Sequence, residues 1–280
     1  MSLGHLFKNN PMLVEIQREK NKALAEHNWR GSQLAARILL GLVYLSILML
    51  LLRYIDIVEP VVLMYVLLAL QTVMVPAALY GTIAGEREKR SLDLLLVAPV
   101  TPGQIVIGKY GRALIPIVGL TVAIGLPAFV VEVVKQVDGR QIGLYGAERN
   151  GIVGFFVSLA FCLMAGLAVG GLTMWISSKT RTSSAAILTT VGAIFLLVAV
   201  TPSIAVTMEG IAPGLSEFVL SMNPFVGLYG AYSGDTLSYD QEMPSTFYTW
   251  FAMLLYLLAT VATLYFATEN VRRLAKGGDV

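Results

Sequence analysis

The stretch GIVGFFVSLAFCLMAGLAVGGLTMWISS, from Gly151 to Ser178, contains no charged residue. A helix needs about 20 apolar residues to cross roughly 30 Å of bilayer hydrocarbon, so this stretch is long enough to span a membrane. The sequence has further charge-free runs, which cover residues 38–52, 60–85, 113–131, 182–208 and 243–268. We therefore predict an all-α polytopic membrane protein with six transmembrane helices.

The composition of the whole chain agrees with this prediction. Of its 280 residues, 56% are hydrophobic and only 14% are charged, and the mean hydropathy is +0.72, whereas a soluble domain carries about 25% charged residues. The net charge of +2 is too small to indicate a nucleic-acid partner. The single cysteine, Cys162, lies in an apolar run, so we predict neither a disulfide framework nor a metal site.

The charges that end each run set the boundaries of the predicted spans. The first run reaches spanning length only if it extends back through Arg37 to Leu34, with the arginine at the membrane interface. Another charge-free run, Phe218–Gly234, is interrupted by Asn223-Pro224, so we predict an outer interfacial or re-entrant segment over 216–234. The predicted spans cover about 34–52, 60–84, 104–134, 151–176, 184–208 and 246–268, followed by a cytoplasmic tail, 269–280.

Lysine and arginine are distributed unequally between the two sides that six spans define. Fourteen of them fall on the side that holds both termini and the second and fourth loops, and the opposite side holds four, which are Arg53, Lys135, Arg140 and Arg149. Cytoplasmic loops carry the excess of basic residues. We therefore predict that both termini are cytoplasmic.

The segment Gly103–Lys109, GQIVIGK, matches the glycine and lysine spacing of a nucleotide-binding P-loop. A working P-loop needs a serine or threonine after the lysine to bind Mg²⁺, and Tyr110 stands there. Thr101 as N-cap, Pro102 at the first helical position and Gln104 in a capping box instead indicate the start of the third span. We expect no ATP site here, and we interpret Lys109 as a basic residue at the membrane interface.

The preceding segment, GEREKRSLDLLLVAP, covers Gly85–Pro99 in the second loop, and we predict a cytoplasmic helix there. Glu86 with Arg90, and Lys89 with Asp93, are spaced four residues apart and can pair on one helix. An apolar side consists of Leu92, Leu95 and Leu96. Such a helix suits docking against a cytoplasmic partner, or it lies on the membrane surface with a solvated charged face.

The loop GTIAGEREKRSLDLLLVAPVTPGQIVIGKYGRAL resembles the signature loop of ABC exporter permeases of the ABC-2 type. The matching features are an acidic element at Glu86 and Glu88, a leucine-rich helix, Pro99, and an isoleucine-rich approach to Gly108-Lys109. Many members have Gly-Thr-Leu-Glu where this chain has RSLD, residues 90–93. Because the glycine is absent, the resemblance does not determine the conformation of the local turn. SMNPFVGL, residues 221–228, is similar to the family's outer Asn-Pro segment. Residues 9–29 are similar to its N-terminal elbow helix, which implies a cytoplasmic amphipathic helix over 1–33.

The resemblance implies a function as well as a fold. Such permeases have six spans, work as dimers with an identical or paralogous copy, and are driven by a separate cytoplasmic ABC ATPase. ATP and Mg²⁺ would then bind to that partner, while this chain binds no cofactor and is not an enzyme. The implied location is the plasma membrane, the inner membrane of a bacterium, in contact with lipid. The coupling residues implied are Glu86, Arg87, Glu88, Arg90, Leu92, Leu95 and Leu96.

By the same resemblance, spans two and five would line the translocation path. The candidate lining residues are Gln71, Thr72, Thr189 and Thr190, although ordinary interhelical hydrogen bonding is an alternative role for them. No ionisable residue lies in the middle of a predicted span, which argues against an ion-driven carrier and against an intramembrane enzyme. The small residues around Gly166 and Gly170 can pack helices closely, within one subunit or between two.

Two other functions stay open on the sequence. A channel or secondary transporter would work without an ATPase. A non-transporting assembly or signalling subunit would use the conformational changes of an ATPase without moving cargo. The sequence does not identify the cargo.

Overall fold

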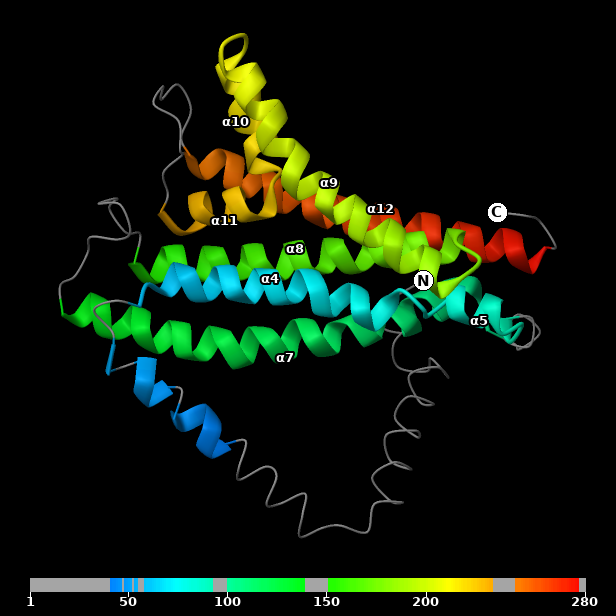
Figure 1. The fold of residues 1–280 in the computed structure, drawn as a ribbon, viewed down its shortest axis with the longest axis horizontal. Coiled ribbons are helices and arrows are strands. Elements are labelled where there is room, and N and C mark those ends of the chain that lie inside the picture. Colours follow the sequence, from blue (N-terminus) through cyan, green and yellow to red (C-terminus); the bar gives the residue numbers. More distant parts are fainter. Residues whose placement is uncertain are drawn as a thin grey trace. The chain divides into compact units, whose positions relative to one another are not determined.

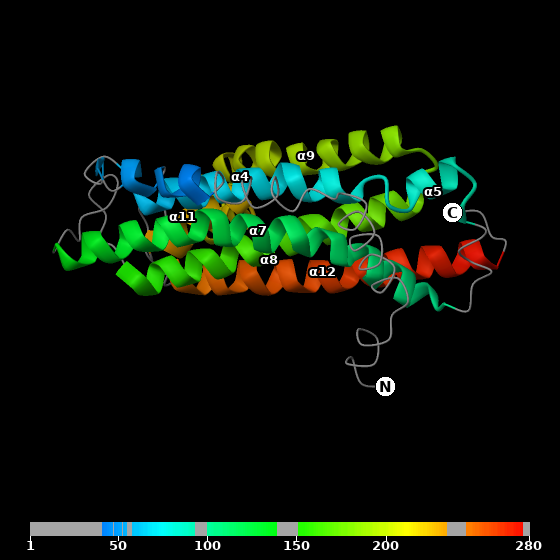
Figure 2. The same cartoon turned by 90° about the horizontal axis from the view of Figure 1, so that it is seen from below.

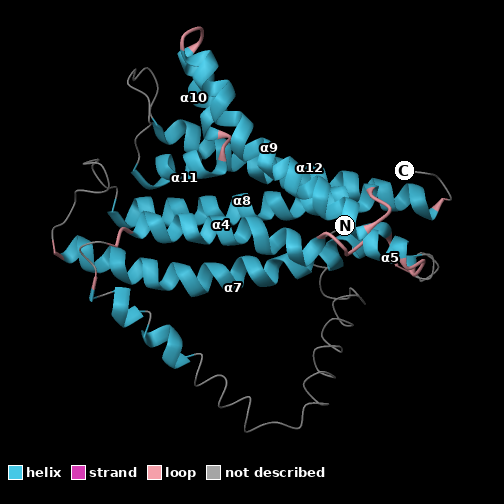
Figure 3. Cartoon of the chain, viewed as in Figure 1, coloured by secondary structure: helices cyan, strands magenta, loops and turns pink. Residues whose placement is uncertain are grey.

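The computed structural model describes residues 41–46, 48–51, 53–54, 58–92, 100–138, 151–233 and 245–276. In this part of the chain the regular structure is helical and contains no strand (Figure 3). The chain divides into two compact units, Met1–Val58 and Glu59–Val280. In the first unit, residues 41–46 and 48–51 are helical. The predicted elbow helix, 1–33, lies outside the described residues.

Five helices in the described residues are long and apolar enough to cross a membrane, which are Pro60–Glu88, Pro102–Val137, Gly151–Lys179, Ser183–Glu209 and Thr249–Ala275. They correspond to the second through sixth predicted spans. The remaining predicted span, 34–52, lies partly outside the described residues, which contain an apolar helical stretch, Gly41–Leu51, within it. The predicted count of six is therefore supported for five.

The second unit is a bundle with α8, Gly151–Lys179, at its centre (Figures 1 and 2). On α8 pack α4, Pro60–Leu79, then α7, Pro102–Val137, and α12, Ser245–Ala275. The buried core around α8 contains Met64 and Leu67 of α4, Phe161 of α8, and Leu228 and Ala252 further along the chain. These helices are apolar around most of their circumference, as expected for helices surrounded by protein and lipid.

Small residues on α8 allow its neighbours to approach closely. A Cβ atom at Gly170 would lie 3.1 Å from Tyr110 and 3.2 Å from Val75, and one at Gly171 would lie 3.3 Å from the Cα of Thr260. The glycine face recognised in the sequence thus packs against α4, α7 and α12 of its own chain. This is the first of the two alternatives that the sequence allowed.

The helix α7 begins as the sequence predicts. Pro102 is its first residue, the Thr101 hydroxyl accepts from the Gln104 N–H, and the Gln104 side chain accepts from the Thr101 N–H at 2.9 Å. The segment Gly103–Lys109 is therefore the first part of a helix and not a phosphate-binding loop. Pro116 and Pro127 both lie within this helix, which extends three residues beyond the predicted span end, to Val137.

Between α9, Ser183–Glu209, and α12 the chain forms two short helices, α10, Pro213–Ser221, and α11, Pro224–Ser233 (Figure 1). Asn223 joins them. Its Oδ1 accepts from the N–H groups of Phe225 and Val226, which caps α11, while its Nδ2 donates to the Val198 carbonyl at 2.8 Å. The predicted outer segment is thus helical on both sides of Asn223, and α10 packs along the end of α9.

At the other end of the bundle, α12 continues to Ala275. The predicted cytoplasmic tail, 269–280, therefore begins inside a helix and not directly after the span.

Candidate functional site

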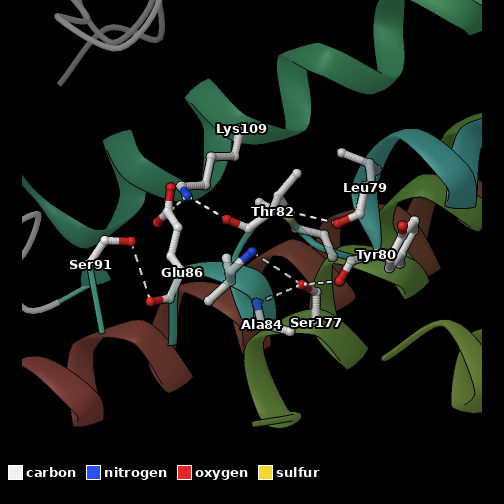
Figure 4. Close-up of polar contacts among 10 residues, drawn as sticks. Leu79, Tyr80, Thr82, Ala84, Glu86, Ser91, Lys109 and Ser177 are labelled. Carbon is white, nitrogen blue, oxygen red and sulfur yellow. Dashed lines mark hydrogen bonds and ion pairs between the residues drawn. The ribbon is translucent and has the colours of Figure 1, made fainter. Parts of the chain in front are cut away.

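The end of α4 is joined to a short helix, α5, Ala84–Glu88, by the turn Tyr80–Ile83. A serine of α8 satisfies the backbone groups that this break in the helix leaves open. The Ser177 hydroxyl donates to the Tyr80 carbonyl at 2.8 Å and accepts from the N–H groups of Ile83, at 3.2 Å, and Ala84, at 3.1 Å (Figure 4). Because Ser177 is fully buried, α5 is held against α8 from its first residue.

Glu86 of α5 forms an ion pair with Lys109 of α7 (Figure 4). The Lys109 ammonium also donates to the Thr82 carbonyl at 2.5 Å. The Lys109 side chain is only 6% exposed, whereas that of Glu86 is 33% exposed. Lys109 is therefore buried against α5, which we did not predict from the sequence, and its position at the level of the membrane interface stays a prediction. The predicted Glu86–Arg90 pair is also replaced, since Glu86 faces α7.

Arg87, the next residue, reaches the C-terminal end of α8. Its guanidinium donates to the carbonyls of Ser178 at 3.4 Å, Lys179 at 3.4 Å and Thr180 at 3.2 Å. A cation at this position satisfies carbonyls that lack a helical partner and complements the negative end of the helix dipole.

Glu88 is an anion at the N-terminal end of α9, whereas Arg87 is a cation at the C-terminal end of α8. Its carboxylate accepts from the N–H of Ser183, the first residue of α9, at 3.0 Å. An anion is stabilised at a helix N-terminus. Three consecutive charged side chains, Glu86, Arg87 and Glu88, thus connect α5 to three different helices, α7, α8 and α9.

The helix predicted over Gly85–Pro99 ends early, at Glu88. Arg90 has φ of 55°, the Arg90 N–H bonds to the Arg87 carbonyl at 3.1 Å, and the Ser91 N–H bonds to the Glu86 carbonyl at 2.9 Å. This is a Schellman termination, whose left-handed residue is usually glycine. In this chain Arg90 occupies the left-handed position, at which the resemblance implied a glycine.

The leucines of the predicted helix are only partly described. Leu92 follows the turn and is 4% exposed, so it packs inside the protein. Leu95, Leu96 and Asp93 lie outside the described residues, and the proposed apolar side of this segment stays a prediction.

A family model described as ABC-2 family transporter protein matches residues 16–274. The chain belongs to the ABC-2 transporter family. It is a multi-pass membrane permease of the ABC transporter class. Curated proteins gave no significant match to the permease sequence.

The four residues predicted to line the path do not line one common cavity within the chain. Gln71 is fully buried, and its amide nitrogen donates to Thr121 Oγ1 at 3.1 Å and to the Ile117 carbonyl at 3.4 Å, both on α7. Thr72 donates to the carbonyl of its own helix at Leu68. Gln71 and Thr72 line a cavity in the bundle, and the predicted residues of α9 are not among its lining residues. Of those, Thr190 is buried and Thr189 is exposed.

Sequence reasoning missed two residues that position α5. Ser177 bonds to residues more than 90 positions away, and nothing in its local sequence marks it. Asn270 of α12 donates to Ser178 Oγ at 2.9 Å and ties the end of α12 to the same site. A signal does exist for Lys109, because it stands alone between apolar residues of a helix that continues into the membrane.

Proposed function

We propose that this permease is the membrane subunit of an exporter driven by a separate cytoplasmic ATPase, and that α5 receives the mechanical stroke. The observation that carries the proposal is the set of contacts made by Glu86, Arg87 and Glu88, one to each of three helices. Charge-assisted hydrogen bonds of this kind are stronger than neutral ones. A force on α5 would therefore be transmitted to the ends of α7, α8 and α9 together.

The connections of α5 also include a fourth helix, α4. The turn Tyr80–Ile83 joins α5 to α4, and the Ser177 hydroxyl holds that turn against α8. Rigid-body motion of a small element that several helices share is a common form of switching. On this proposal α5 changes the angle of four spans at once, which would open and close a path between them.

The outer surface of α5 and of the turn after it is exposed at Glu88, Lys89 and Arg90. We place the contact with the ATPase here, on the cytoplasmic side. ATP and Mg²⁺ bind to the ATPase in this scheme.

The apolar surface of α9 favours a second permease copy, identical or paralogous, as a further partner. Only Ala186, Thr190 and Ala205 of this helix are buried, while its exposed apolar side chains include Leu188, Val191 and Phe195. In a dimer with α9 at the interface, Thr189 would face the shared path, as the resemblance implied. Lipid is the alternative neighbour of this surface.

The test is to purify the permease from its native membrane in a mild detergent and to identify an ATPase that co-purifies. Two variants separate docking from coupling. Lys89→Glu reverses an exposed charge and is expected to weaken ATPase association. Arg87→Ala removes the contact with α8 and is expected to leave association intact while lowering the amount of cargo moved per ATP hydrolysed.

Two results would contradict this function. Transport at full rate by the permease alone, without ATP, would favour the channel or secondary transporter. A complex that hydrolyses ATP without accumulating any cargo in vesicles would favour the non-transporting subunit.

A further inference from the structure

A cavity of about 310 Å³ lies within one permease chain, between α4, α8, α9 and α12. Its volume falls at the lower end of the range for small-molecule sites, which is roughly 300–1,000 Å³. No charged residue lines it, and most of the lining residues belong to helices long enough to cross a membrane. The cavity therefore lies at the depth of the bilayer hydrocarbon. Representative lining residues are Leu68, Ala165, Val169, Leu197, Leu255 and Ala259.

Helix α9 forms one wall of this cavity and is held by polar contacts near both of its ends. At its start the Ser183 N–H donates to the Glu88 carboxylate at 3.0 Å. Near its other end the Ala205 carbonyl accepts from the Ser216 hydroxyl at 2.8 Å. Between these contacts, over residues 191–204, no side chain is fully buried. The middle of α9 thus stands beside the bundle without close packing, and the cavity occupies the space between them.

The other walls leave this space open because they carry small residues. These walls pack on one another, since α8 contacts both α4 and α12, whereas α9 and α12 scarcely touch in the described part of the chain. Figure 2 shows α9 and α12 along opposite edges of the bundle. The cavity is partly open, and its open side therefore lies between α9 and α12, toward the membrane. The small lining residues are Ala165, Gly166 and Ala168 of α8 and Ala252 and Ala259 of α12.

The polar groups in the wall are already occupied within the protein. Tyr256 donates to the Met222 carbonyl at 2.8 Å, and Thr263 donates to a carbonyl of its own helix at 2.7 Å. Thr72 likewise donates within α4, and Gln71 is fully buried. A polar or charged ligand would lose its hydration here without gaining hydrogen bonds in return. The wall therefore selects a hydrocarbon.

We propose that the cavity binds one acyl chain of a membrane phospholipid, which enters between α9 and α12 and stays bound as a resident component of the permease. Water does not fill a cavity that is apolar, and an unfilled cavity leaves its lining without dispersion contacts. The surrounding bilayer supplies acyl chains in excess. A bound chain provides the contacts that the middle of α9 lacks. The site lies inside one chain and does not depend on coupling to an ATPase.

A second permease copy on α9 would leave this site free. Ile194 and Leu197 line the cavity, whereas the exposed Leu188 and Phe195 point in another direction. At 3.6 residues per turn, the two pairs are separated by roughly 140° around the helix. A copy that packs on Leu188 and Phe195 therefore does not fill the cavity, and lipid keeps access to it.

The experiment uses the full permease in mixed micelles with a phosphatidylcholine probe that carries a photoreactive diazirine in the middle of one acyl chain. Peptide mass spectrometry follows labelling as the mole fraction of the probe rises. Labelling of the lining segments of α9 and α12 should saturate at one probe per chain, while labelling of other exposed helix faces should rise in proportion. Unlabelled phosphatidylcholine and phosphatidylglycerol should compete equally, because the chain and not the head group binds. Competition by one of them alone would contradict a chain site.

Ala259→Phe and Ala262→Phe are matched variants, because both alanines are exposed on α12 and only Ala259 lines the cavity. The ring at position 259 should lower saturable labelling by about fivefold or more, since it displaces roughly one or two methylene groups of the chain. Ala262→Phe should leave it unchanged. If Ala259→Phe does not fold, Ile194→Trp narrows the cavity from the α9 wall and should have the same effect. Labelling of the unmodified permease that does not saturate, or equal labelling of the two phenylalanine variants, would overturn the proposal.

A resident lipid also has to be distinguished from cargo. Mass spectrometry of the permease purified with its ATPase, before and after ATP turnover, makes this distinction. A phospholipid that stays bound through turnover, and that Ala259→Phe removes, supports the proposal. A molecule that leaves during turnover is cargo, and this result would overturn the assignment to a resident acyl chain.

Discussion

Removing Glu86 alone should cost much more stability than removing Lys109 alone, although the two residues form one ion pair. In Glu86→Leu the Lys109 ammonium keeps the Thr82 carbonyl but loses its counter-ion, in a position where the lysine side chain is only 6% exposed. Removing one partner of a buried pair costs about 3–5 kcal/mol. In Lys109→Met the remaining carboxylate belongs to a side chain that is 33% exposed. Water can solvate it, so we expect a loss of only about 1–2 kcal/mol.

The double variant, Glu86→Leu with Lys109→Met, replaces the pair with apolar groups, which is often close to neutral. It should be more stable than Glu86→Leu alone by about 2–3 kcal/mol. Thermal unfolding of the purified permease, followed by intrinsic fluorescence at one scan rate, measures the order of stability of the unmodified chain and these variants. With roughly 2–4 °C per kcal/mol, Glu86→Leu should unfold on the order of 10 °C below the unmodified chain, and Lys109→Met a few degrees below it.

Glu269 provides the control. It pairs with Arg272 at 2.9 Å, but this pair is exposed, and exposed pairs contribute about 0–1 kcal/mol. Glu269→Leu should therefore change the unfolding temperature by at most a few degrees. Equal losses for Glu86→Leu and Lys109→Met, or a double variant whose loss is the sum of both, would refute the asymmetry argued from burial.

Three further predictions concern the backbone. Arg90 occupies a left-handed turn, so Arg90→Gly should raise stability by about 1 kcal/mol, and Arg90→Ala should not; thermal unfolding of both variants checks this. A Cβ at Gly227 would lie 2.6 Å from Phe161 and 2.9 Å from a carbonyl oxygen, whereas Gly119 has nothing within 4 Å. In the same assay Gly227→Ala should lose roughly 1–3 kcal/mol or more, while Gly119→Ala should gain up to about 1 kcal/mol. Asn223→Ala should lose about 1–2 kcal/mol through the α11 cap, and Asn223→Asp should lose at least as much, because a buried carboxylate oxygen would replace the Nδ2 that donates to the Val198 carbonyl; a smaller loss for aspartate than for alanine would show that the capping oxygen matters more than this donor.

The ends of the long helices were predictable because charged residues mark where a chain leaves the membrane. The span expected over 184–208 is the helix Ser183–Glu209, and that expected over 151–176 is Gly151–Lys179. The start of α7 was predictable for a different reason, since Thr101, Pro102 and Gln104 act on one another within a single turn.

The contacts that fix α5 could not be read in the same way. Pairing at i and i+4 assumes that the helix continues, and the left-handed turn at Arg90 stops it before Glu86 and Arg90 can meet. Lys109 and Ser177 come to α5 from other helices, and their contacts depend on how three spans pack. Leu92 follows the turn, is helical and is buried, while the other leucines of the predicted apolar side, Leu95 and Leu96, lie outside the described residues.

The central place of α8 has a consequence for how this permease can diverge. Fourteen of its 29 residues are buried, against three of the 27 residues of α9. A substitution in α8 therefore alters contacts with several helices at once, whereas most positions of α9 can change without disturbing the interior of the same chain. Descendants of this sequence should accordingly accumulate differences in α9 early, and with them new assembly partners, while α8 remains nearly invariant.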